Sequence, residues 1–203
     1  MEEDKNSSDS NKRGPSLGYS DISPKRAMWQ EIANKENGIF KISMTSGKEI
    51  ETHNISIPYK KWNIEISNSD TRPLKFQISF QTCLDFDLTI SWEDFIDRIG
   101  KVFGKHDIEL GLMEFDKHYQ VKSNRPDLVK EIITTNIQKT FLKYNVCSLS
   151  FQAANNNKGA ELISVIERNA GTKEMILELI DTFKLLIDNI VKMRITEKQG
   201  LKL

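Results

Sequence analysis

Hydrophobic and polar residues alternate with a period of two over much of the first half of the chain, which indicates β-strands. Trp62, Ile64 and Ile66 share one face of such a pattern, with polar residues between them. Residues 74–80 and 84–90 repeat the same alternation. Short alternating strands joined by brief polar turns predict an antiparallel meander.

Residues 39–57 predict a further pair of strands, with Ser46 and Gly47 at the turn. In the second strand, His53, Ile55 and Ile57 would face the side opposite to their polar neighbours. The alternation is imperfect, so the sequence leaves the register of this pair open. A short helix over residues 28–35, ending near Gly38, is expected before it.

Helical periods appear in the second half of the chain. Residues 91–103 predict a helix capped by Ser91, and residues 126–144 predict one that begins at Pro126 and breaks around residues 134–136. Residues 146–153 and 160–168 flank a polar turn and predict a hairpin. A last helix, over residues 173–195, has a wide apolar stripe that would pack across a sheet.

These elements predict an α+β fold with a largely antiparallel sheet, a mid-chain helix pair and a long C-terminal helix packed on one face. Residues 1–27 are polar and are expected to form a disordered tail, and residues 28–203 a single domain. The sheet has two possible arrangements. An open sheet has edges that can take a protein partner, whereas one curled around the last helix, as in helix-grip proteins, would enclose an apolar cavity.

Composition narrows the function classes. Lys plus Arg number 29, as do Asp plus Glu, and this neutral balance argues against general nucleic-acid binding. No secretory leader or transmembrane segment is found, so the expected location is cytoplasmic. Cys83 and Cys147 form no CxxC motif and are interpreted as small buried residues. The common catalytic and phosphate-binding motifs are missing, so we expect no cofactor and favour a protein that is not an enzyme.

One stretch, residues 104–124, carries two of the three histidines and four acidic residues. If residues 113–123 form a strand, Asp116 and His118 share one face, and ligands spaced by two on a strand can converge on a metal. His106, Asp116 and His118 are therefore the candidate residues of a metal-dependent or hydrolytic enzyme, our third hypothesis. A solvated sheet face explains the same pattern and is favoured.

Aromatic and basic residues interleave at Tyr59, Lys60, Lys61 and Trp62. Single-stranded nucleic acid stacks on such platforms, but the neutral net charge favours an exposed strand edge that docks a protein. These four residues are the predicted ligand or partner surface. The leading hypothesis is a non-enzymatic interaction module that contacts a protein partner or a second copy of itself. The alternative is a carrier of a small apolar ligand in a helix-grip-like cavity.

Phe115, Asp116, Tyr119, Val121 and Ser123 fit the pattern F-D-x-x-[FY]-x-V-x-S, in a strand followed by a helix. Over about 50 residues around this pattern, the chain resembles a bacterial domain family of unknown function. The resemblance implies a bacterial domain and supports the α+β fold. It carries no catalytic residues to this chain.

Overall fold

The computed structural model describes residues 23–44, 50–80, 86–92, 107–153, 159–167 and 171–200, and the side chains of these residues except 23, 80, 153 and 194–200. Several predicted features lie outside these residues. They are most of the polar tail, the turn at Ser46 and Gly47, Cys83, His106, and the predicted helix over residues 91–103 apart from its first two residues.

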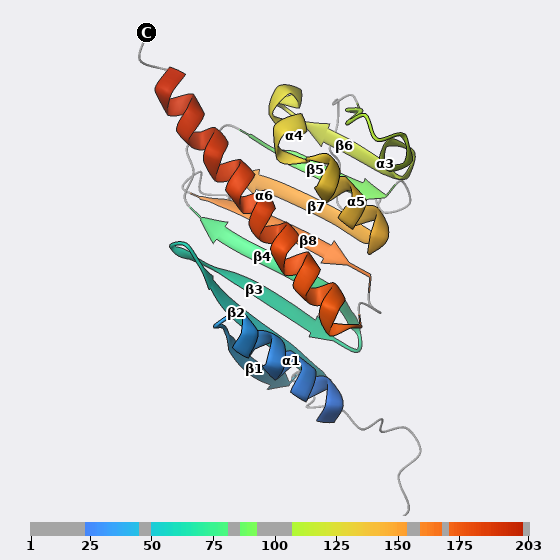
Figure 1. Ribbon diagram of the computed structural model, residues 1–203, viewed down its shortest axis with the longest axis vertical. Helices are drawn as coiled ribbons and strands as arrows, with labels where there is room; N and C mark the ends of the chain where they lie inside the picture. Colours follow the sequence, from blue (N-terminus) through green and yellow to red (C-terminus); the bar gives the residue numbers. More distant parts are fainter. Residues whose placement is uncertain are drawn as a thin grey trace, which may run out of the picture.

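Eight strands form one antiparallel sheet in the order β1-β2-β3-β4-β8-β7-β5-β6 (Figure 1). The strands are β1 Ile39–Met44, β2 Glu51–Tyr59, β3 Trp62–Ser69, β4 Arg72–Phe80, β5 Leu88–Trp92, β6 Tyr119–Ser123, β7 Val146–Ala153 and β8 Ala160–Ile166. The meander of β1 to β4 and the β7–β8 hairpin confirm the alternating patterns. The meander does not continue into the strand predicted at residues 84–90, because β8 lies beside β4, and β5 lies between β7 and β6. The sheet stays open, because β1 and β6 lie at its two ends.

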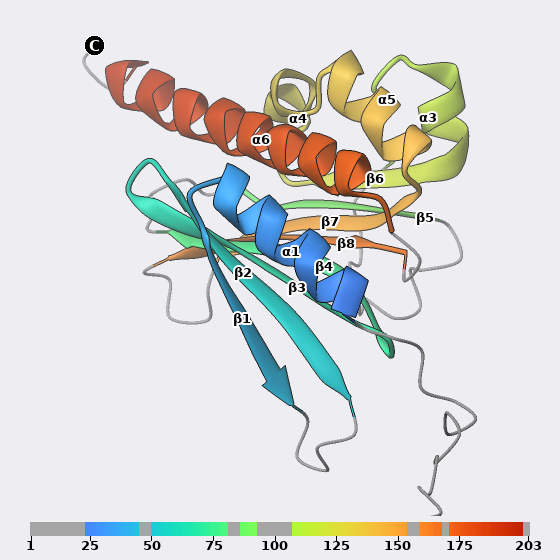
Figure 2. The same ribbon diagram turned by 60° about the horizontal axis from the view of Figure 1, so that its bottom comes forward.

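Helices gather on one side of this sheet (Figure 2). They are α1 Ser23–Lys35, α3 Met113–His118, α4 Pro126–Ile132, α5 Thr135–Lys143 and α6 Lys173–Gly200. The C-terminal helix α6 runs across the sheet, α1 packs on β1 and β2, and the three short helices lie near the β6 end. The predicted α+β fold with a C-terminal helix on one face is confirmed.

A continuous core fills the space between the helices and the sheet. The period-two residues of β2, β3 and β4 point into it, and the Phe76 ring meets the Phe183 ring of α6 at 5.5 Å between centroids. These side chains are almost wholly buried, including Ile55, Ile64 and Leu74. The same face therefore supplies both the alternation in the sequence and the floor on which α6 packs.

Two helix boundaries agree with the sequence. The helix predicted from Pro126 breaks as expected, because α4 ends at Ile132 and α5 begins at Thr135. Thr172 caps α6, since its Oγ1 accepts the N–H of Met175 at 3.2 Å. Among the described helices, none is both long and apolar enough to cross a membrane.

Three local predictions were wrong. The first helix begins at Ser23, so residues 23–27 are helical and do not belong to a disordered tail. Ser91 does not cap a helix, because it lies inside β5 between Gln120 of β6 and Ser148 of β7. Residues 113–123 are not one strand, because α3 occupies their first half and β6 their second.

The helix at residues 113–118 has a clear physical cause. Phe115 and Tyr119 are four residues apart, and their rings stack at 4.5 Å, which a helical turn allows and a continuous strand does not. The Asp116 carboxylate accepts the N–H groups of Leu110 and Gly111, at 2.8 and 2.9 Å. These bonds fix the loop that leads into the helix.

Candidate functional site

Strand β1 forms an exposed end of the sheet. It is the first strand in the sheet order and pairs with β2 on one side. Ile39, Ile42 and Met44 are 61%, 43% and 50% exposed, and Lys41 is the only charged residue of the strand. An edge strand turns backbone N–H and C=O groups outward, so β1 combines outward-facing backbone groups with exposed apolar side chains.

Apolar residues of β1 occupy both faces of the sheet. Ile42 lies opposite the buried His53 and so points to the helix side, while Ile39 lies opposite Ser56 and points to the other. Helix α1 does not cover Ile42 or Met44, because both stay exposed beside it. Strand β1 therefore presents apolar side chains on the helix side of the sheet and on the opposite side.

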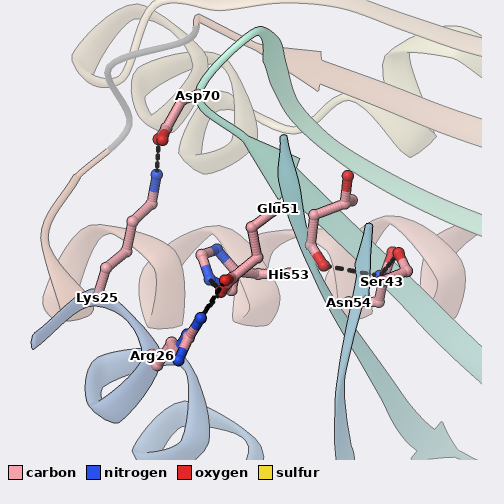
Figure 3. Close-up of polar contacts among 8 residues, drawn as sticks. Lys25, Arg26, Ser43, Glu51, His53, Asn54 and Asp70 are labelled. Carbon is pink, nitrogen blue, oxygen red and sulfur yellow. Dashed lines mark hydrogen bonds and ion pairs between the residues drawn. The ribbon is translucent and has the colours of Figure 1, made fainter. Parts of the chain in front are cut away.

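His53 fastens β1 and β2 to α1. Its ring is 2% exposed and lies between the rings of Trp29 and Phe40, with centroids 6.2 and 5.9 Å away. Its Nε2 is 2.6 Å from the Oε1 of Glu51, and Arg26 of α1 binds both oxygens of the same carboxylate (Figure 3). Helix and edge hairpin are thus held together by ring stacking and by a shared carboxylate.

Electrostatics favour a charged Glu51 and a neutral His53. Hydrogen bonds from Arg26 are the main reason that the pKa of Glu51 falls to about 2. Burial lowers the pKa of His53, and the neighbouring Glu51 opposes this only in part. Because the ring is almost fully enclosed, the pair braces the hairpin and has no access to a substrate.

Two polar contacts brace the ends of the same region (Figure 3). Lys25 of α1 forms an ion pair with Asp70 in the β3–β4 turn, at 2.5 Å. On the face away from the helices, the amide of Asn54 donates to the hydroxyl of Ser43 at 2.9 Å. The Asn54–Ser43 bond therefore ties β1 to β2, and the Lys25–Asp70 pair ties α1 to the β3–β4 turn.

The predicted partner surface at Tyr59, Lys60, Lys61 and Trp62 has a different setting from the one expected. It is the turn between β2 and β3, and both strands have neighbours on each side, so it is not a strand edge. The Tyr59 hydroxyl donates to Asp188 of α6 at 2.7 Å, and the Lys60 ammonium pairs with the same carboxylate at 2.5 Å. The turn is thus fastened to α6, and its contact with a partner stays a prediction.

The candidate metal residues do not converge in the described part of the chain. Asp116 is occupied by the loop amides, whereas His118 Nδ1 lies 2.8 Å from the backbone oxygen of Glu114. His106 lies outside the described residues. Within the described ranges, no group of three or more His, Cys, Asp or Glu side chains could hold a metal ion.

His118 instead lines an open cleft of about 570 Å³ at the β6 end of the molecule. The described residues that line this cleft are Trp92, Glu114, Lys117, His118, Tyr119, Leu142 and Asn145. Charged and aromatic side chains mix on its walls. It lies at the far end of the sheet from β1.

Cys147 is buried, as expected, and burial raises the pKa of its thiol to about 11. A thiol with so high a pKa is a poor nucleophile at neutral pH.

Sequence reasoning located β1 but did not predict that its apolar side chains are exposed. Residues 39, 40, 42 and 44 are all apolar, which is more than one face of a strand can hold. Apolar residues in excess of one face are the signal in the sequence for a strand that also has apolar surface on its second face or edge.

Comparisons with known proteins show the fold and no family. No family model matches the chain, and no curated protein matches it. Among solved structures, the crystal structure of the mycobacterial trehalose monomycolate transport factor A is similar, with a TM-score of 0.50 and 8% sequence identity. The match covers 82% of this chain and 96% of that one. At this identity, the likeness concerns the arrangement of helices and strands alone.

Proposed function

We propose that this protein is a non-enzymatic interaction module whose β1 edge accepts an extended strand from a protein partner. The observation that carries the proposal is the exposure of Ile39, Ile42 and Met44 on a strand at the end of the sheet. Strand addition to a sheet edge supplies main-chain hydrogen bonds for affinity and side-chain contacts for specificity.

The edge is prepared for this role. The stack of His53 between Trp29 and Phe40 and the Arg26–Glu51 contact hold the hairpin in place, so a partner need not order it. Binding to a preordered surface avoids part of the entropic cost of association.

A library of random octapeptides, selected on the wild-type protein, tests the proposal. Selected peptides are then measured against the Ile42→Lys variant, because it places a charge on the apolar helix-side face of β1, where Lys41 does not point. The matched control is Leu185→Lys, which charges an exposed apolar residue on α6. We expect Ile42→Lys to weaken binding at least tenfold and Leu185→Lys to leave it unchanged. Peptides that bind all three proteins equally would refute the β1 site.

Carriage of a small molecule is the second candidate function. It is favoured by the cleft of about 570 Å³, which falls in the range of ligand pockets, and by the likeness to a protein described as a transport factor. It ranks second because the cleft is open and partly charged, and because the core beneath α6 is filled.

The apolar dye anilinonaphthalene sulfonate tests this second candidate. Carriage in the cleft predicts dye fluorescence that Trp92→Ala reduces and Trp62→Ala, at the hairpin turn, does not. Equal fluorescence for both variants and the wild type would exclude the cleft as the binding site.

A further inference from the structure

We infer that the strand which docks on β1 is the β1 strand of a second copy of this chain. The inference rests on the proposed function of the edge and names its occupant. Two copies related by a twofold axis would join their sheets into a single antiparallel sheet with the eight strands of each copy.

Geometry restricts how two β1 strands can pair. A twofold axis perpendicular to the sheet keeps each face on its own side, so a residue must meet one that points to the same face. In the six residues of β1, the twofold axis can therefore pass through either of the two central residues, Lys41 or Ile42. An axis between these two residues would set helix-side residues against residues of the other face.

Charge selects between the two axes. An axis through Lys41 would place the two lysines directly opposite each other, which is destabilising. An axis through Ile42 sets Lys41 opposite Ser43, and it joins Phe40 with Met44 and Ile42 with its own copy on the helix side. The strand is therefore self-complementary in one register, with an apolar stripe on one face and no like charges opposed.

Long-range charge does not oppose this association. The chain has a formal net charge of zero, so two copies do not repel each other as a whole. Lys41 is the only charged residue of β1, so a partner strand with several charges could pair only one of them there. The single, isolated charge of the edge thus suits a second β1 better than a highly charged segment.

The opposite end of the sheet favours a closed pair over a filament. Beyond a β1–β1 pair, a filament would need a further contact at β6, the other end of the sheet. There, the N–H of Ile108 already donates to the backbone oxygen of Val121 at 2.9 Å. Because that edge is partly occupied, the β1–β1 contact ends the assembly at two copies.

Cysteine cross-linking of the full chain tests the pairing. In the proposed register, the two Ile42 positions face each other at about 5 Å between Cα or Cβ atoms, so Ile42→Cys forms a disulfide-linked dimer under mild oxidation. Ile39→Cys, on the same strand, serves as the matched control. Its two copies would stand six positions apart, about 20 Å, which is too far to link. The wild-type chain reports any linkage through Cys83 and Cys147.

Sedimentation of the unmodified chain supplies an independent readout. We expect a concentration-dependent dimer and an apparent Kd at least tenfold higher for Ile42→Lys. A wild-type monomer at about 100 µM without an Ile42→Cys disulfide would overturn the inference, as would a dimer that Ile42→Lys leaves unchanged. Cross-linking of Lys41→Cys in place of Ile42→Cys would also overturn it, by showing the other register.

The two proposals fail in different ways. If the chain is a monomer but selected octapeptides still depend on Ile42, the inference is wrong and the proposed function stands. If the peptides are also indifferent to Ile42→Lys, the proposed function fails with it.

Discussion

The two edge strands of the sheet, β6 and β1, differ in how far other segments cover them. At β6, the inward residues Tyr119, Val121 and Ser123 are buried, and the segment before α3 donates a hydrogen bond to the strand. At β1, five of the six residues are exposed. Edge strands are a hazard that proteins usually cover or charge; among the described residues β1 has one lysine and no covering segment, which supports the contact surface that we propose.

The β6 edge is also locked at its end. The N–H of Asp87 donates to the Asn124 side chain, and the N–H of Asn124 donates to the Asp87 carboxylate, each at 2.9 Å. Ser123 adds a bond to the backbone oxygen of Asp87 at 2.5 Å. The β1 hairpin lacks such a reciprocal lock among its described residues and depends on packing against α1. Different substitutions should therefore destabilise the two edge strands.

The largest effect is expected at the covered edge. Phe115→Ala removes a fully buried ring that stacks on Tyr119 and lies 6.4 Å from Phe141. We expect it to lower the free energy of unfolding by about 3–5 kcal/mol, measured by urea denaturation. Met113→Ala on the same helix, at a residue 70% exposed, should cost less than about 0.5 kcal/mol. Similar costs for both would show that α3 does not brace β6.

At the open edge, His53→Ala should cost about 2 kcal/mol, because it removes the ring that packs between Trp29 and Phe40. The β1 amides should then exchange with solvent faster, while the β6 amides keep their protection. Hydrogen exchange measured by NMR distinguishes the two strands. Uniform acceleration across the sheet would contradict a local role for His53.

Removal of the β6 lock is expected to have a smaller effect. Asn124→Ala deletes the acceptor for the Asp87 N–H and should cost about 1 kcal/mol in thermal or urea unfolding. Asn63→Ala, at an exposed position of β3, is the matched control and should be close to neutral. If Asn124→Ala also exposes β6 amides and leaves β1 amides unaffected, the lock belongs to that edge alone.

Acid should loosen the β1 side through Glu51. Its pKa in the folded protein is about 2, below its ordinary value, so its contribution to stability is present above about pH 4.5 and is lost as the pH falls toward 2. Between about pH 5 and about pH 2, the free energy of unfolding of the Glu51→Gln variant should fall by about 1 kcal/mol less than that of the wild type. The difference is this small because solvent screens the exposed Arg26 side chain. Identical acid profiles would contradict the Arg26–Glu51 contact.

His53 acts in a neighbouring pH range with the same sign. Burial lowers its pKa in the folded state, so the unfolded chain binds the proton first, and stability falls as the pH drops below about 6.5. A His53→Phe variant should lose this part of the profile and keep the part that Glu51 causes. Retention of the loss below about pH 6.5 in that variant would assign it to another group.

The smallest effect on stability is expected from Ile42→Lys. Its side chain is 43% exposed, so the free energy of unfolding should change by less than about 0.5 kcal/mol. Association should nevertheless fall, which would separate the role of β1 in contact from its role in folding. A large loss of stability would mean that Ile42 is part of the core.

Strands β3 and β4, the β7–β8 hairpin and α6 could be predicted because a single period governs each of them. Residues 113–123 could not, because their polar and apolar residues fit period two by coincidence. There, the stacking of Phe115 on Tyr119 and the bond from the Tyr119 hydroxyl to the Phe141 backbone oxygen, at 3.0 Å, decide in favour of a helical turn. Packing against a distant helix overrides the local pattern.

By itself, the sequence determined which residues are buried. Their spacing also determined the α+β class and the long helix on the sheet. Only the tertiary structure decided which strands lie at the edges. That outcome depends on pairings between distant segments, such as Leu74 of β4 with Ile166 of β8. Side-chain periodicity reports how a strand meets the core, but not which strand lies beside it, because neighbours in a sheet are joined through backbone groups that all residues share.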